Sequence, residues 1–223
     1  MSEAITPLVL FDLDGTLLDS ARDLHAAMDA LLAAKSEPAV AFEEFRPVVS
    51  KGARAMLKQS FKQADEGARE ALLPEFLAEY ERRLAEHSRL FDGVADLLER
   101  IEALGPRWGI VTNKPYYLAE PLVRKLGWQS RSAILLGGDS LPRKKPEPDQ
   151  LLHACARLSV PPARTVYVGD DERDVQAANA AGMRSVGALW GYRPLDDDPV
   201  RWRADALIEA PLELIERGLL HGL

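Results

Sequence analysis

The fold is decided by the stretch Pro7-Leu-Val-Leu-Phe-Asp12-Leu-Asp14-Gly-Thr16 near the start of the chain. Its first half is almost continuously apolar, as expected of a strand that is buried on both faces of a parallel sheet. Its second half brings two carboxylates, followed by a glycine that allows a sharp turn. Unpaired buried carboxylates are costly. The stretch therefore predicts that Asp12 and Asp14 meet a partner at the carboxyl end of a central strand.

Short apolar runs alternate with helical patterns along the rest of the chain, which favours a doubly wound, Rossmann-like α/β fold with a parallel sheet. The later strands are expected near residues 108–112, 133–136, 165–169, 185–189 and 206–208, and helices near 97–104, 118–126, 149–158, 174–181 and 212–219. In such sheets ligands bind outside the carboxyl ends of the strands.

The segment 19–89 contains helical patterns and no convincing strand. It is too long for a simple crossover between the first two strands of the sheet. The sequence therefore predicts an inserted all-helical cap domain at 19–89, with a catalytic core formed by 1–18 and 90–223. At the start of the cap, Ser20 and Asp23 resemble a helix capping box.

Composition narrows the possible partners and location. The 223 residues are 47% hydrophobic and 28% charged, and the net charge is -7. Nucleic-acid affinity rests on clustered Lys and Arg, so we expect no nucleic-acid partner. The single cysteine, Cys155, excludes an internal disulfide. Residues 1–7 lack the features of an export signal, and no apolar stretch is long enough to span a bilayer. We expect a cytoplasmic protein without a membrane partner, as a monomer or homodimer.

Three further motifs follow expected strands or precede expected helices. Thr112-Asn113 could donate hydrogen bonds to phosphate, although the pair is also common in turns. Lys144-Lys145-Pro-Glu-Pro-Asp149 has prolines that would hold a lysine in place, although a solvated basic loop is an equal alternative. Gly169-Asp170-Asp171-Glu-Arg-Asp174 is a second acidic cluster, and Asp171 alone would be explained as a helix cap.

The acidic motifs together predict a metal site. Asp12, Asp14 and Asp170 would repel one another strongly if they converged without a counter-ion. A divalent ion with oxygen ligands removes this repulsion, and Mg²⁺ suits the role because it retains waters and shares phosphate oxygens. The four histidines are scattered and offer no competing transition-metal site.

The ordered series of Asp12-x-Asp14-x-Thr16, Thr112, Lys145 and Gly169-Asp170 with Asp174 resembles the haloacid dehalogenase superfamily of aspartate-nucleophile phosphatases. The helical insert matches the place of that superfamily's cap, so the resemblance spans nearly the whole chain. It implies hydrolysis of the phosphate monoester of a small metabolite through an aspartyl-phosphate intermediate.

The resemblance also implies a role for each motif residue. Asp12 would be the nucleophile and Asp14 the general acid and base, while Thr112, Asn113 and Lys145 would bind the phosphoryl group. Mg²⁺ would be held by the Asp12 carboxylate, the Asp14 backbone carbonyl and Asp170. Asp174 would support Lys145 or the water shell of the metal.

Two departures from the family pattern stand out, because Lys144 replaces a frequent glycine and Asp171 replaces a frequent Ser or Thr. Several segments, among them Ser50-Lys-Gly-Ala-Arg54 and Thr112-Asn-Lys-Pro115, resemble the phosphoglycolate phosphatases. The same segments also resemble a relative that dephosphorylates N-acetylmuramic acid 6-phosphate. A small acid phosphate is slightly preferred. Lys51 and Arg54 would then meet a substrate carboxylate, or else form a solvated basic face.

Three rival functions are weaker. A dehalogenase of this fold would not need a carboxylate at Asp14. A phosphomutase of the beta-phosphoglucomutase type would carry a cap histidine where this chain has Leu24, and His25 is displaced by one position. A binding module that had lost activity would be expected to lack the nucleophile or the lysine. In the loop after the 185–189 strand, Trp190 and Tyr192 are candidates for lining the site entrance.

Overall fold

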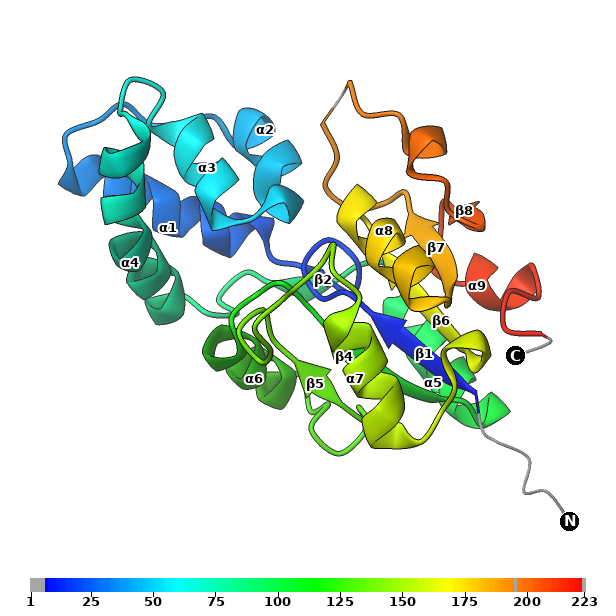
Figure 1. Ribbon diagram of the computed structural model, residues 1–223. Helices are drawn as coiled ribbons and strands as arrows, with labels where there is room; N and C mark the ends of the chain where they lie inside the picture. Colours follow the sequence, from blue (N-terminus) through cyan, green and yellow to red (C-terminus); the bar gives the residue numbers. More distant parts are fainter. Residues whose placement is uncertain (1–6, 195, 222–223) are drawn as a thin grey trace, which may run out of the picture.

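The computed structural model describes residues 7–194 and 196–221. Residues 1–6, which were considered above for an export signal, lie outside this range. Figure 1 shows a sheet with helices on both sides and, next to one end of it, a separate group of helices. In the described part of the chain, no helix is both long and apolar enough to cross a membrane.

The sheet confirms the predicted doubly wound fold. Its six parallel strands lie in the order β5-β4-β1-β6-β7-β8. Their bounds are β1 (Leu8–Phe11), β4 (Arg107–Val111), β5 (Leu135–Leu136), β6 (Thr165–Gly169), β7 (Arg184–Ala188) and β8 (Ala206–Ile208). The strand expected at 133–136 is only two residues long and lies at the edge of the sheet.

Both faces of the sheet are covered by helices, which explains why β1 is apolar throughout. Val9 and Phe11 pack with α5 (Val94–Leu104), α6 (Tyr116–Lys125) and α9 (Glu213–Glu216). Leu8 and Leu10 point to the other face and pack with α7 (Asp149–Leu158) and α8 (Glu172–Ala181). Alternate side chains of a strand point to opposite faces, so each face of the sheet receives its own hydrophobic core.

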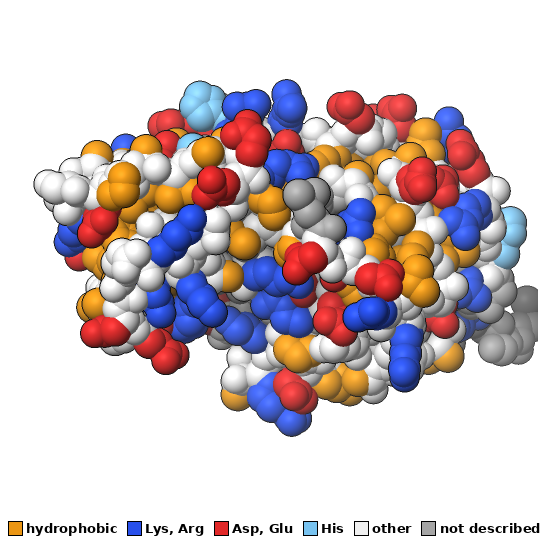
Figure 2. Space-filling model, turned by 90° about the horizontal axis from the view of Figure 1, so that it is seen from above, with side chains coloured by type: hydrophobic (Ala, Val, Ile, Leu, Met, Phe, Trp, Pro, Cys, Tyr) orange, Lys and Arg blue, Asp and Glu red, His pale blue; other side chains and the backbone are white. Residues whose placement is uncertain are grey.

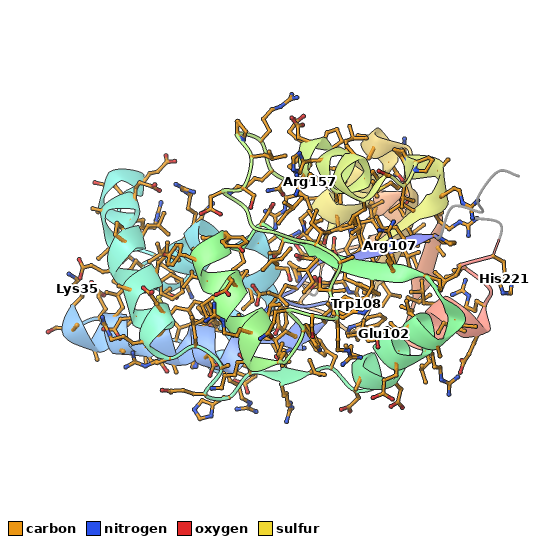
Figure 3. All side chains as sticks on the ribbon, turned by 90° about the horizontal axis from the view of Figure 1, so that it is seen from below. Lys35, Glu102, Arg107, Trp108, Arg157 and His221 are labelled. Carbon is orange, nitrogen blue, oxygen red and sulfur yellow. The ribbon has the colours of Figure 1, made fainter. Side chains whose placement is uncertain are left out.

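The side chains seen from below in Figure 3 mark the extent of the molecule. Lys35 lies at the far end of the helical group, and His221 lies at the opposite end, beyond the sheet. Between them, Trp108 of β4 lies beside Glu102 of α5, and its indole N–H donates to a Glu102 carboxylate oxygen over 2.8 Å. This hydrogen bond satisfies the polar atom of an otherwise apolar, buried ring.

The separate helical group lies within the segment 19–89, where the sequence predicts an inserted cap, and is called the cap below. It consists of α1 (Ala21–Ala34), α2 (Phe42–Phe45), a 3₁₀ turn η1 (Arg46–Lys51), α3 (Ala53–Ser60) and α4 (Glu66–Arg82). Its helices pack around a hydrophobic cluster of their own, which includes Met28, Phe45 and Phe76. Leu118 and Tyr192 of the core join this cluster and so attach the cap to the core.

Two chain crossings connect the cap to the core, and they are paired. The outgoing crossing contains the short strand β2 (Leu18–Asp19), and the returning crossing contains β3 (Arg89–Leu90). The two strands pair in antiparallel fashion. The buried Asp23 carboxylate accepts hydrogen bonds from the backbone N–H groups of His87 (2.7 Å) and Ser88 (3.0 Å). The predicted capping box is therefore wrong, because Asp23 binds the returning chain and the Ser20 side chain makes no cap.

Candidate active site

Asp12 is the first residue after the central strand β1, which lies between β4 and β6 in the sheet. Thr112 follows β4, and Asp170 follows β6. Because parallel strands end at a common edge, the three motifs meet at the carboxyl edge of the sheet. The backbone N–H of Asp12 donates to Val168 O over 2.9 Å and keeps the nearby strand ends in register.

The Lys145 ammonium reaches this edge from the loop that precedes α7. Its Nζ lies 3.0 Å from Asp12 Oδ1 and 2.6 Å from Asp174 Oδ1. Lys145 is only 3% exposed. Burial lowers its pKa, but the carboxylates of Asp12 and Asp174 outweigh burial and raise the pKa above its ordinary value. Lys145 is therefore a fixed cation beside the predicted nucleophile.

Two neighbours hold Lys145 and its loop in place, and the sequence analysis gave neither of them this role. The Tyr167 hydroxyl accepts a hydrogen bond from Lys145 Nζ over 2.6 Å and donates to Val111 O over 2.7 Å. Asn113, which was predicted to bind phosphate, donates from its side-chain amide to Lys145 O over 2.9 Å. Its side chain thus holds the lysine loop. Tyr167 was missed because it lies in an apolar strand, where its sequence pattern indicates only core packing.

Thr112 is buried beside these residues at the end of β4. Its hydroxyl oxygen accepts a hydrogen bond from the Lys114 backbone N–H over 3.2 Å. A hydroxyl that accepts one hydrogen bond still has its own hydrogen to donate, so Thr112 is able to serve an anionic oxygen at this edge.

The Asp170 carboxylate is fully buried and accepts three hydrogen bonds. They come from Thr16 Oγ1 (3.2 Å), the cap residue Ser50 through Oγ (2.6 Å), and the backbone N–H of Tyr192 (2.8 Å). The space around the carboxylate also depends on glycine. A Cβ on Gly15, whose φ is +85°, would lie 2.1 Å from Asp170 Oδ2, so no other residue fits there without displacing the carboxylate.

Asp12, Asp170 and Asp174 form a carboxylate cluster in which one oxygen of each lies within 4.8 Å of the others. Burial first, and then the negative charges of Asp12 and Asp174, raise the pKa of Asp170 well above its ordinary value. Burial also raises the pKa of Asp174 to about 6, although Lys145 acts in the opposite direction. In both cases burial is the largest cause, and the neighbouring carboxylates add to it. Since these oxygen ligands suit a hard cation, the cluster could hold a divalent metal ion.

Asp14, predicted as a metal ligand through its backbone carbonyl, turns its side chain away from this cluster. Its carboxylate accepts hydrogen bonds from Ser20 Oγ (2.5 Å) and from Lys114 Nζ (2.9 Å). Lys114 also donates to the hydroxyl of Tyr80 on the cap helix α4 over 2.8 Å. The sequence analysis mentioned Lys114 only as part of the segment Thr112-Asn-Lys-Pro115 and gave it no role of its own. Its place directly after Thr112-Asn113 was the signal that could have indicated a functional role.

The two cap cations predicted to meet a substrate both have acidic partners. Lys51 Nζ lies 2.8 Å from Asp171 Oδ2, and Arg54 pairs with the exposed Glu70 at 2.6 Å. Arg173 donates to Asp171 Oδ1 over 2.8 Å and also to the carbonyl oxygen of Ser50. Asp171, which stands where the family often has Ser or Thr, thus joins the core to the cap.

A cavity of about 390 Å³ lies between cap and core. Asp14, Asn113 and Lys114 line it on the core side. Its cap side is largely apolar, with Leu73 and Phe76 among the lining residues. This volume is at the lower end of the range that is usual for small-molecule sites, about 300–1,000 Å³. The cavity therefore provides room for a small organic group next to Asp14.

Trp190 and Tyr192 do not belong to the described lining of this cavity. The Trp190 indole N–H donates to Thr16 O over 2.9 Å. The buried Tyr192 hydroxyl donates to Asp19 Oδ1 (2.7 Å) and accepts from the Ala21 N–H (3.1 Å). Both aromatic residues fix the segment around the first motif.

A comparison of the chain with models of protein families finds a match to a hydrolase family. The model of the haloacid dehalogenase-like hydrolases matches residues 6–182.

Two of the curated relatives that match most of the chain illustrate the similarity. The phosphoglycolate phosphatase of Xanthomonas campestris pv. campestris (strain 8004) is 56% identical over 208 residues, which cover 93% of this chain and 94% of the relative. The N-acetylmuramic acid 6-phosphate phosphatase of Pseudomonas putida (strain KT2440) is 45% identical over 207 residues, covering 92% and 93%.

Among solved structures, a predicted phosphoglycolate phosphatase from Haemophilus somnus 129PT superimposes with a TM-score of 0.85. Its sequence is 27% identical, and the match covers 97% of this chain and 99% of that one. The similarity therefore includes the cap as well as the sheet.

Proposed function

Since the chain belongs to the haloacid dehalogenase-like hydrolases, we propose that it is a magnesium-dependent phosphatase acting on a small phosphorylated acid. Asp12 is the nucleophile and Asp14 is the general acid and base. The substrate assigned first is phosphoglycolate.

The observation that carries this proposal is the position of the Asp12 carboxylate. It lies 3.0 Å from a buried ammonium and within 4.8 Å of two further buried carboxylates. Phosphoryl transfer depends mainly on positioning and on neutralising the charge of the transferred group. A carboxylate held next to Lys145 and a cation site meets both requirements.

Mg²⁺ would be held by the carboxylates of Asp12 and Asp170 and the backbone carbonyl of Asp14, with Asp174 close by. When bound, the metal ion would neutralise negative charge on the phosphoryl group. The three carboxylates of Asp12, Asp170 and Asp174, whose oxygens lie within 4.8 Å of one another, support this ligand set.

The reaction proceeds in two transfers. An Asp12 carboxylate oxygen attacks phosphorus, the bond from phosphorus to the alcohol oxygen breaks, and Asp14, which enters this step protonated, gives its proton to that oxygen. Asp14 then takes a proton from water while the water oxygen attacks phosphorus. The Asp12–phosphorus bond breaks, and inorganic phosphate and the Asp12 carboxylate are formed.

The other motif residues hold the transferred group. The Lys145 ammonium and the Thr112 hydroxyl bind phosphoryl oxygens, and the Asn113 backbone N–H adds a third donor. The Asn113 side chain contributes indirectly, because it fixes the Lys145 loop. Fixed donors of this kind need no rearrangement as charge develops, which is the main source of their catalytic effect.

Phosphoglycolate is favoured by the relative at 56% identity over 93% of the chain. N-acetylmuramic acid 6-phosphate is the second candidate, supported by the relative at 45% identity. One observation favours it: the apolar cap side of the cavity would suit the methyl groups of a larger substrate better than a two-carbon acid.

The test is turnover of both esters by the purified chain with and without Mg²⁺, combined with rapid acid quenching and mass spectrometry of peptides. We expect Mg²⁺-dependent phosphate release and a phosphorylated peptide that contains Asp12. Absence of turnover for every ester, or phosphorylation at a different residue, would overturn the proposal.

A further inference from the structure

The cap–core cavity contains an excess of positive charge. Five cationic side chains are among its described lining residues, whereas Asp14 is the acidic one: Lys51, Arg54, Lys114, Lys144 and Arg173. In the view from above, Lys and Arg side chains gather near the middle of the molecule, where the cap meets the core (Figure 2). A cavity with this lining favours an anionic occupant.

Four of the five cations already have acidic partners. Lys51 and Arg173 share Asp171, Arg54 pairs with Glu70, and Lys114 pairs with Asp14. Each of these four cations is thus held by a carboxylate of the protein. Such cations are poor candidates for a new contact, because a ligand would have to compete with a carboxylate that is already in place.

Lys144 is different. Its ammonium has no ion-pair or hydrogen-bond partner among the residues that the structure describes. Partial burial lowers its pKa, and the charges of Arg54 and Arg173 lower it further, while Asp139 acts in the opposite direction. Lys144 is thus a solvent-exposed cation that lines the cavity, is repelled by neighbouring cations and holds no carboxylate of the described residues.

The place of Lys144 in the chain relates it to the reacting group. It directly precedes Lys145, whose ammonium lies 3.0 Å from Asp12. Adjacent Cα atoms are about 3.8 Å apart, so the two lysines start from nearly the same point. Lys145 faces the carboxylate cluster and Lys144 faces the cavity. One short molecule could therefore place its phosphate near the first ammonium and a second anionic group near the other.

We propose that Lys144 is a specificity-determining residue that binds a carboxylate of the substrate, so that the enzyme selects phosphate esters of carboxylic acids over neutral phosphate esters. This inference rests on the proposed phosphatase function and deepens it. It assigns the role to Lys144, the departure from the family's frequent glycine, in place of Lys51 and Arg54, which Asp171 and Glu70 already engage.

The test compares matched pairs of esters that differ in an acidic group. Phosphoglycolate is paired with 2-hydroxyethyl phosphate, and N-acetylmuramic acid 6-phosphate is paired with N-acetylglucosamine 6-phosphate. The variants are Lys144→Ala, Lys144→Arg and the control Arg143→Ala. Arg143 is a neighbouring cation that pairs with Asp149 at 2.8 Å and does not belong to the described cavity lining.

For the acidic ester of whichever pair is turned over, we expect Lys144→Ala to raise KM about tenfold, which corresponds to ~1.4 kcal/mol. The KM of the neutral partner should change less than about twofold, and kcat should change little for both. Lys144→Arg should restore most of the discrimination, and Arg143→Ala should leave it unchanged.

Equal losses for the acidic and neutral esters would overturn the inference, because they would mean that Lys144 acts by positioning Lys145. Unchanged constants for both esters would overturn it as well. If the unaltered enzyme hydrolyses none of the four esters, the proposed function fails first and this inference falls with it, so the two failures are distinguishable.

Discussion

The two sides of the site differ in the sign of their excess charge. In the carboxylate cluster at the strand edge, the three aspartates Asp12, Asp170 and Asp174 lie beside the ammonium of Lys145. The cap–core cavity is lined by five cations, and the acidic partners of these cations among the described residues are Asp171, Glu70 and Asp14. The two aspartates of the first motif, only two positions apart, therefore face opposite environments.

Under the proposed function, this difference lets a single short motif serve two chemical tasks. The first side has an excess of carboxylates, which suits a divalent cation. The second side has an excess of cations, which favours an anionic organic group. A phosphoryl group at their boundary would be held by the cation-binding side, while its leaving oxygen would face Asp14. Four changes would test this division.

The largest effect is expected for Asp12→Asn. The amide keeps the shape of the side chain but is a very poor nucleophile, so turnover should fall by at least about 10⁴-fold. Initial-rate measurements with Mg²⁺ would show the loss, and circular dichroism would check the fold. Asp92→Asn, a change at an exposed aspartate, is the matched control. Substantial remaining activity in Asp12→Asn would exclude Asp12 as the nucleophile.

Asp170→Asn should affect Mg²⁺ binding and the stability of the metal-free fold in opposite directions. Loss of one carboxylate should weaken Mg²⁺ binding roughly 10–100-fold, as seen by calorimetric titration. The same change removes a buried charge whose pKa is strongly raised. In EDTA the variant should therefore melt at a higher temperature than the parent, by roughly 2–4 °C per kcal/mol of relieved repulsion. A lower melting temperature in EDTA would contradict the assigned excess of negative charge.

Tyr167→Phe tests the support of Lys145. The change removes a hydroxyl that accepts from the ammonium and donates to Val111 O. A hydrogen bond to a charged group contributes about 1.5–3 kcal/mol, so kcat should fall about tenfold or somewhat more. Mg²⁺ affinity should stay within about twofold, because Tyr167 does not belong to the carboxylate cluster. A rate within twofold of the parent would show that Asp174 alone suffices to hold Lys145.

The smallest effect concerns pH. Burial raises the pKa of Asp174 to about 6, above the ordinary value of about 3.9 for an unfolded aspartate. The folded state therefore binds this proton more tightly, and the metal-free protein should lose stability as pH rises from about 4 through about 6. In EDTA, melting temperatures should fall by a few degrees between pH 5 and pH 7. Stabilisation by Mg²⁺ should grow over the same interval.

Asp174→Asn is the control for this pH dependence, since it removes the titrating group. If the variant and the parent lose stability equally with rising pH, other groups are responsible.

The parallel sheet could be predicted because apolar residues recur at different spacings in buried strands and in amphipathic helices. A buried strand that ends in carboxylates also indicates a binding site, because buried charges without partners are costly. The same logic placed Asp12, Thr112, Lys145 and Asp170 at one edge, where the structure has them. The short strands β2 and β3 were not predicted. Each has two residues, and their pairing depends on a partner about seventy positions away.

Side-chain directions were the part that sequence patterns could not supply. Ser20 and Asp23 have the spacing of a capping box, but Ser20 binds Asp14 and Asp23 binds the returning chain. These tertiary hydrogen bonds form in place of the local helix cap because the buried polar groups involved have no other partners. For the same reason the position of Lys144 in the lining of the cap–core cavity could be seen only with the cap packed on the core.

Asp23 also ties the two chain crossings to each other. Its carboxylate, on the first cap helix, binds the N–H groups of His87 and Ser88 in the returning crossing, next to the paired strands β2 and β3. The cap reaches the core a second time through Ser50 and Lys51, which bind Asp170 and Asp171. By joining the two crossings, Asp23 thus helps to set where these two cap side chains meet the acidic residues of the core.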